Sequence, residues 1–101
     1  MGELLTEPDS LSRYLPEFEW DDINEGHLLD SHGVTVYEAE SCFGQPNTRK
    51  RSGDRLLMLG KTDDDRMLFL VYVQKPDGTV RVISGRDMTA GERATYRRDA
   101  R

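Results

Sequence analysis

Guanidinium and imidazole side chains are the groups of this chain best suited to reacting with a phosphodiester. Metal-free cleavage of RNA requires that the 2′-hydroxyl loses a proton, that the phosphorane charge is stabilised and that the leaving 5′-oxygen gains a proton. Arginine suits the second task, because its forked donors match phosphate oxygens and it stays ionised. His32 suits the proton transfers, since the ordinary pKa of histidine lies near neutrality. Arg55 and Arg86, each beside a predicted strand, are the first candidates for the phosphate.

Arg86 stands at the end of the last predicted strand. Alternation with a period of two places its side chain on the same face as Val82 and places Arg81 on the opposite face. Arg81 and Arg86 are therefore expected to reach different phosphates unless a bulge intervenes. The competing interpretation of Arg86 is a structural ion pair with one of two acids, Glu92 or Glu40.

A run of three cations, Arg49-Lys50-Arg51, lies in the polar segment 44–54, which we predict to be a loop. Flexible cations attract an RNA backbone without selecting its sequence, so this run is a candidate RNA-binding site. Exposed loop charge without a ligand is the alternative. Arg55 follows at the edge of the next predicted strand.

The remaining reactive side chains have strong structural interpretations. His32 precedes Gly33, where a helix is expected to end, and a histidine there commonly hydrogen-bonds the last carbonyls. His27 lies five residues earlier, hence not on the same helix face, and no further ligand completes a zinc spacing. The acidic run Asp63-Asp64-Asp65 is typical of a turn between strands, and the lone Cys42 of a buried, unreactive thiol. The sequence therefore predicts neither a metal site nor a cofactor.

Hydrophobic periodicity and turn residues predict an α+β fold, with an antiparallel sheet of about four strands and helices packed on it, in the order β-α-α-β-β-β-α. The apolar run at 66–74 is typical of a central strand buried on both faces. The first helix is expected to carry Ile23, Leu28 and Leu29 near one face. The expected strands are 16–20, 55–61, 66–74 and 79–85, and the helices begin after Asp21 or Asp22, at the capping box Thr35–Glu38 and at the capping box Thr89–Glu92.

The distribution of charge matters more than its total. The formal net charge of -5 at pH 7 argues at first against a nucleic acid partner. Residues 1–40, however, hold eleven acids and one arginine, whereas residues 41–101 hold thirteen Lys/Arg and eight acids. Such grouping can create a basic surface on an acidic protein, so the composition permits RNA binding. A solvated surface of uneven charge is the alternative.

A chain of 101 residues is expected to form one domain, which we place at 16–101. Residues 1–15 mix acids, proline and serine with few apolar residues, and are expected to be an N-terminal extension, either partly disordered or loosely packed. The sequence shows no apolar leader and no apolar run near the ~18 residues of a membrane span. These features predict a cytoplasmic protein without membrane contact.

Several short motifs follow one another along residues 16–98. They are Phe18-Glu19-Trp20-Asp21, His32-Gly33-Val34, Gly53-Asp54-Arg55, Ile83-Ser84-Gly85-Arg86 and Glu92-Arg93 with Tyr96, together with Asn24, Glu38 and Glu40 in predicted helices. In their order and spacing these motifs resemble those of the BrnT family of small bacterial toxins, which are ribonucleases of type II toxin–antitoxin pairs.

The resemblance implies a RelE-like fold and a metal-independent endoribonuclease whose arginines stabilise the phosphate. Arg55 and Arg86 match motif positions of the family, and Arg93 and Tyr96 of the final helix join them as candidate active-site residues. Locking that helix to the sheet is the alternative role of the last two. The implied partners are RNA and a BrnA-like ribbon-helix-helix antitoxin, with DNA contacted only through the antitoxin complex.

The chain departs from the family pattern just before His32. Members commonly carry a basic pair there, whereas this chain has Asp30-Ser31. This difference removes a cation and adds a carboxylate beside His32. It favours the alternative that the chain is a non-catalytic RNA- or partner-binding protein on the same fold. A third hypothesis is that the acidic first part masks the basic part or docks a basic partner. Gly85 replaces the usual alanine, and Asp54 replaces glutamate.

Overall fold

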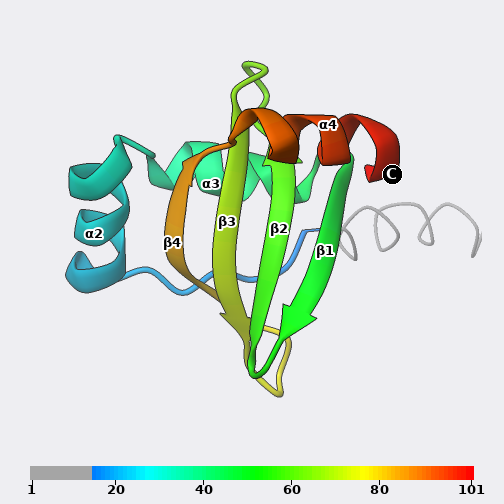
Figure 1. Ribbon diagram of the computed structural model, residues 1–101. Coiled ribbons are helices and arrows are strands. Elements are labelled where there is room, and N and C mark those ends of the chain that lie inside the picture. Colours follow the sequence, from blue (N-terminus) through cyan, green and yellow to red (C-terminus); the bar gives the residue numbers. More distant parts are fainter. Residues whose placement is uncertain (1–14) are drawn as a thin grey trace, which may run out of the picture.

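A four-stranded antiparallel sheet with the strand order β1-β2-β3-β4 forms the centre of the computed structural model, which describes residues 15–101 (Figure 1). The strands are β1 (Asn47–Ser52), β2 (Arg55–Lys61), β3 (Met67–Gln74) and β4 (Val80–Asp87), and the helices are α2 (Asp22–His32), α3 (Val36–Phe43) and α4 (Ala90–Asp99). The predicted α+β class and antiparallel pairing are confirmed. The predicted extension, apart from Leu15, lies outside the described residues.

Two predictions about strands are wrong. Residues 16–20 form no strand of the sheet, and only Phe18 makes a parallel bridge, to Val80. Segment 44–54, predicted to be a loop, contains β1, which turns into β2 through Gly53 at φ 65°. β1 lacks apolar alternation because it is a polar edge strand, held by backbone pairing with β2. The order of the described elements is therefore α-α-β-β-β-β-α.

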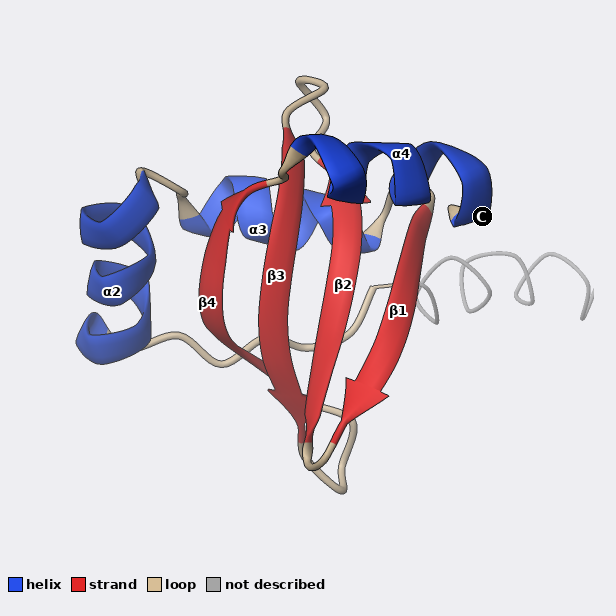
Figure 2. Ribbon diagram, in the orientation of Figure 1, coloured by secondary structure: helices blue, strands red, loops and turns tan. Residues whose placement is uncertain are grey.

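The helices cover the two faces of the sheet unequally (Figures 1 and 2). α3 lies behind the sheet in the view of Figure 2, and α2 stands beside the edge strand β4, where its Leu28 joins the core. α4 crosses the other face near one end of the strands. The predicted buried thiol is confirmed: Cys42 is fully buried in the core, and desolvation raises its pKa to about 12.

β3 is central, but it is fully buried on one face only. Leu68, Leu70 and Tyr72 are buried in the core, whereas Phe69 and Val71 on the opposite face are half-buried. The predicted burial on both faces is therefore wrong for the described part of the chain. We call the second surface the open face; beyond α4, no described helix covers it. Its apolar members are Leu57, Leu59, Phe69, Val71 and Val73.

α2 is attached by one apolar and one polar side chain rather than by an apolar stripe. Leu28 is buried as predicted, but Ile23 and Leu29 are 77% and 50% exposed. The buried amide of Asn24 donates to the carbonyls of Glu19 and Val82, both at 3.1 Å. Buried polar groups that are fully hydrogen-bonded can fix geometry that apolar packing leaves free. Asn24 therefore sets the position of α2 against β4.

A bulge in β4 decides which side chains reach the open face. Tyr72 pairs with Val82, while the preceding Val71 pairs with Ser84, so Ile83 is an extra residue in β4. Arg86 consequently pairs with Phe69 and lies on the open face, away from Val82. The prediction that Arg86 and Val82 share a face is wrong, because the bulge reverses the alternation. Arg81 pairs with Val73 and belongs to the same face as Arg86.

The same bulge turns Gly85 toward the core, where a side chain has no room. A Cβ atom there would lie 2.7 Å from Leu70 Cδ2 and 2.9 Å from Leu28 Cδ1. We expect Gly85→Ala to lower the free energy of unfolding by about 1–3 kcal/mol, measured by urea denaturation. In a Leu28→Ala background, Gly85→Ala should lower the free energy of unfolding by less, because one of the two close contacts is gone. An equal cost in both backgrounds would contradict this explanation.

Candidate functional site

Three rows of side chains cross the open face, as the strand register shows. The row nearest α4 runs from Arg86 through Phe69 and Leu59 to Thr48. The middle row runs from Ser84 through Val71 and Leu57 to Lys50. The far row holds Arg81 beside Val73 and Arg55 beside Ser52. The face therefore has an apolar centre with cations at its borders, and it brings Arg55 and Arg86 onto one surface at opposite ends.

Arg86 is half-buried at the border of this face and forms a two-pronged ion pair. Its Nη1 and Nη2 donate to the two carboxylate oxygens of Glu92 at 2.8 and 2.9 Å. Its guanidinium lies 4.4 Å from the centre of the Phe69 ring. Of the two acids that the sequence offers as structural partners, Glu92 is the one present, while Glu40 accepts from the Trp20 indole. The guanidinium of Arg86 thus lies against the Phe69 ring and binds an anion, the carboxylate of Glu92.

The pair predicts a specific loss of stability in acid. Hydrogen bonding to Arg86 lowers the pKa of Glu92 from 4.5 to about 2. A depressed pKa means that this stabilisation is present above pH 4.5 and is lost as the pH falls through 2. We therefore expect the stability difference between the wild type and Glu92→Gln to disappear across this range in pH-dependent urea unfolding. Glu25→Gln, at an exposed carboxylate without an ion pair to the described residues, should show no such convergence.

Arg66 is the residue that the sequence reasoning missed. Its Nε and Nη2 donate to Asp87 at 2.9 and 3.2 Å, and its Nη1 donates to Glu38 at 3.2 Å. The same guanidinium also donates to the backbone carbonyls of His32 and Gly33, both at 3.0 Å. Arg66 therefore ties the end of α2, the start of α3 and the end of β4 to the start of β3. No local spacing signals this role, since Arg66 simply follows an acidic turn.

His32 ends α2 with an exposed side chain. The last carbonyls of the helix are bound by Arg66 and by the backbone N–H of Gly33, which has φ 62°, rather than by the imidazole. The charge of His32 contributes, after that of Arg66, to lowering the pKa of Asp87. His32 thus lies near the residue that follows Arg86, which places an imidazole close to the α4 end of the sheet.

Arg93 and Tyr96 hold α4 in place. The Tyr96 hydroxyl is carried on a buried ring and donates to the carbonyl of Pro46 at 2.9 Å. Arg93 donates to the carbonyl of Met88 at 2.9 Å. Their alternative role, locking the helix to its surroundings, is therefore present in the structure. A catalytic role for either residue stays a prediction.

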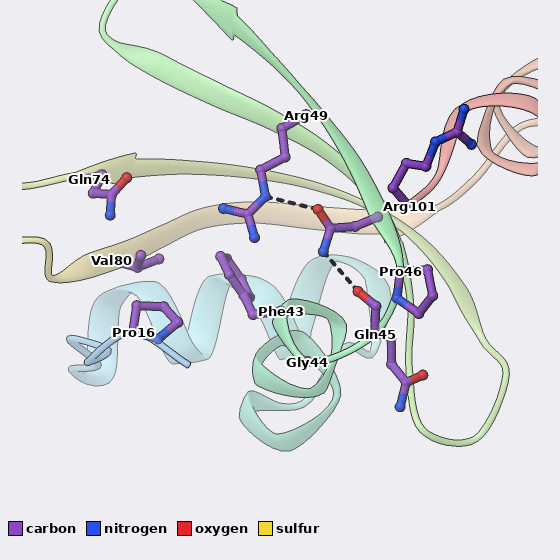
Figure 3. A pocket seen from close by; sticks show the side chains of 10 residues that line it. Pro16, Phe43, Gly44, Gln45, Pro46, Arg49, Gln74, Val80 and Arg101 are labelled. Carbon is purple, nitrogen blue, oxygen red and sulfur yellow. Dashed lines mark hydrogen bonds between the residues drawn. The ribbon is translucent and has the colours of Figure 1, made fainter. Parts of the chain in front are cut away.

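Strand β1 divides the run Arg49-Lys50-Arg51 between the two faces of the sheet. Lys50 lies on the open face, but Arg49 enters a cavity of about 510 Å³ on the opposite side, beside Phe43 (Figure 3). Arg49 Nε donates to Asn47 at 2.9 Å, and its Nη1 donates to the hydroxyl of Tyr72 at 3.0 Å. The three cations therefore do not form one flexible loop cluster, which corrects the predicted arrangement.

The β1–β2 hairpin nevertheless concentrates the free positive charge. Its exposed cations, Arg49, Lys50, Arg51 and Arg55, form no ion pair with a carboxylate of residues 15–101. Acids from the first forty residues instead neutralise other cations: Glu19 binds Lys75 and Arg81, and Glu38 binds Arg66. The hairpin is therefore one exposed surface that keeps unpaired positive charge among the described residues.

Residues 15–101 contain no group of three or more His, Cys, Asp or Glu side chains placed to hold a metal ion. No helix among them is both long enough and apolar enough to cross a membrane.

Comparisons with known proteins agree with the geometry. A family model described as "Ribonuclease toxin, BrnT, of type II toxin-antitoxin system" matches residues 20–92. Among solved structures, the chain is similar to the crystal structure of the Brucella abortus ribonuclease toxin, BrnT, at 17% sequence identity and a TM-score of 0.59, covering 73% of this chain and 97% of that chain. No curated protein matches the chain. The structural likeness confirms the α+β fold.

Proposed function

Because this chain belongs to the BrnT family of ribonuclease toxins from type II toxin–antitoxin systems, we propose that it is a metal-independent endoribonuclease toxin whose arginines stabilise the phosphate under attack. The observation that carries the proposal is Arg86, whose fork stands at the border of the open face and holds a carboxylate. A guanidinium fork binds carboxylate and phosphate oxygens with the same bidentate geometry. A phosphate of the RNA would take the place of Glu92.

The other cations of the open face fit a supporting role. Arg55 and Lys50 are exposed and lie on the hairpin side, opposite Arg86. Unpaired surface cations attract the RNA backbone without reading its sequence, and they hold a strand across the face. Preorganised cations at a developing phosphorane charge are the kind of catalyst that needs no metal ion. His32 stays a candidate for a proton transfer, but its neighbour Asp87 pairs with Leu68 and lies on the face opposite Arg86.

The family also suggests the partners. We propose RNA as the substrate, a BrnA-like ribbon-helix-helix protein as the antitoxin, DNA contact only through the toxin–antitoxin complex, and action in the cytoplasm by one domain at 16–101. The half-buried apolar side chains of the open face are a surface that the antitoxin would cover when it blocks access to Arg86.

Cleavage of RNA in the presence of a chelator tests the proposal. The purified chain should cleave single-stranded RNA in EDTA, and its expression alone should stop bacterial growth. Coexpression with a small protein encoded by an adjacent gene should restore growth. A folded protein that neither cleaves RNA nor slows growth would show that the proposed activity is wrong.

A non-catalytic RNA-binding protein is the second candidate function. Two observations favour it: the fork of Arg86 is occupied by Glu92, and the position before His32 carries Asp30-Ser31. RNA binding that depends on salt but occurs without turnover would select this function over the toxin.

A further inference from the structure

A cavity of about 520 Å³ lies between α4 and the open face. Its floor is apolar and consists of Leu57, Leu59 and the ring of Phe69. α4 contributes Glu92, Thr95 and Asp99 to its lining. The Arg86 guanidinium lies 4.4 Å from the centre of the Phe69 ring. Aromatic rings and guanidinium planes are surfaces on which proteins commonly stack single bases of RNA.

The polar groups around this cavity are two cations, two carboxylates and two hydroxyls, from Arg49, Lys50, Glu92, Asp99, Thr48 and Thr95. Asp99 of α4 contributes a carboxylate, and Thr48 and Thr95 contribute hydroxyls that bond to no other side chain of the described residues. Within residues 15–101, Asp99 forms an ion pair with its exposed neighbour Arg98, which donates to both carboxylate oxygens at 2.9 and 3.2 Å. Such a pair is weak, and each carboxylate oxygen keeps a second lone pair for a ligand.

The position of Asp99 is unfavourable for the helix itself. An acid in the last turn faces the negative end of the helix dipole, where a cation or a neutral residue would be more stable. Its ion pair with Arg98 offsets this cost, and the carboxylate also lines the cavity. Arg86, on one side of the cavity, and Lys50, on its lining, are placed to hold phosphates flanking a bound base.

We propose that this cavity binds one unpaired base of the RNA and favours guanine. Guanine carries two adjacent donors, the ring N1–H and the exocyclic amino group, which match the two oxygens of one carboxylate. The other three bases offer no such pair on one edge. This inference rests on the proposed function, because it names the base that would lie beside the phosphate held by Arg86.

Binding of single nucleotides tests the inference without requiring turnover. The full isotope-labelled chain is titrated with the 3′-monophosphates of guanosine, adenosine, cytidine and uridine, and with ribose 5-phosphate. Guanosine monophosphate should bind at least about fivefold more tightly than the others and shift the amide signals of Thr48, Leu59 and Thr95. Equal affinity for all four, or shifts that ribose 5-phosphate reproduces, would overturn the inference.

A pair of matched variants separates the carboxylate from a general loss of charge. Asp99→Asn should abolish the preference for guanosine monophosphate, so that it binds no more tightly than the other three nucleotides, because one bidentate contact is lost. Asp64→Asn removes the same charge from an exposed turn and should leave the preference unchanged. A retained preference in Asp99→Asn would overturn the role of Asp99. A chain that cleaves RNA without base preference would reject this inference and leave the proposed activity intact.

Discussion

Arg86→Ala should lower the rate of RNA cleavage by about 100- to 1000-fold, the usual effect of removing one preorganised donor to a transition-state charge. The fork of Arg86 binds both oxygens of Glu92 at the border of the open face. Cleavage of a short single-stranded RNA in EDTA measures the rate, and thermal unfolding of each variant confirms that the protein is folded.

Two substitutions serve as controls for this experiment. Arg86→Lys keeps the charge but loses the fork, so it should recover only a small part of the activity. Arg97→Ala removes an exposed charge from α4 that forms no ion pair with a described carboxylate, and it should change the rate by less than about twofold. If Arg86→Ala is folded and cleaves RNA as fast as Arg97→Ala, the phosphate role of Arg86 is wrong.

The features that were predictable from the sequence are local ones. The caps of the three described helices, at Asp21, Thr35 and Thr89, lie where the sequence places them. A cap depends on a side chain and a backbone group two or three residues apart, so its signal is contained in a few letters. The turns between the last three strands follow the same logic, because Gly78 and the acidic run before β3 mark them directly.

The errors concern relations between distant residues. β1 has a polar sequence and exists because the apolar β2 pairs with it, which no window of its own residues reveals. The predicted strand at 16–20 fails because only Phe18 and its neighbours reach β4. The bulge at Ile83 depends on how β4 packs against Leu28 and Leu70, and it alone decides the face on which Arg86 lies.

In the candidate site, too, the sequence identified single residues but not the arrangement that depends on distant parts of the chain. Motif order nominated Arg55 and Arg86, and the structure places both on the open face, while their roles stay predictions. The prediction of a loop at 44–54 treated Arg49 and Lys50 as one cluster. Because these residues lie in a strand, their side chains point to opposite faces of the sheet. Motif order also gave no reason to choose Arg66, whose partners His32, Glu38 and Asp87 are 34, 28 and 21 residues away in the sequence.

Arg66 carries the second large expected effect, which concerns stability. Arg66→Ala should lower the free energy of unfolding by about 2–4 kcal/mol in urea denaturation, because it leaves two carboxylates and two helix-end carbonyls without their donor. The side chains of Arg66 and Glu38 are only 27% and 21% exposed, so water replaces the lost bonds incompletely.

A lysine cannot substitute for this guanidinium, since one ammonium group cannot reach Asp87, Glu38 and the end of α2 together. Arg66→Lys should therefore be nearly as unstable as Arg66→Ala. The matched control is Arg98→Ala, which breaks an ion pair whose arginine is 71% exposed and should cost less than about 0.5 kcal/mol. A cost for Arg66→Ala as small as that control would mean that α2, α3 and the end of β4 are held together by apolar packing alone. In that case Asp87 and the adjoining Arg86 would keep their positions without Arg66, and RNA cleavage by the variant would equal that of the wild type.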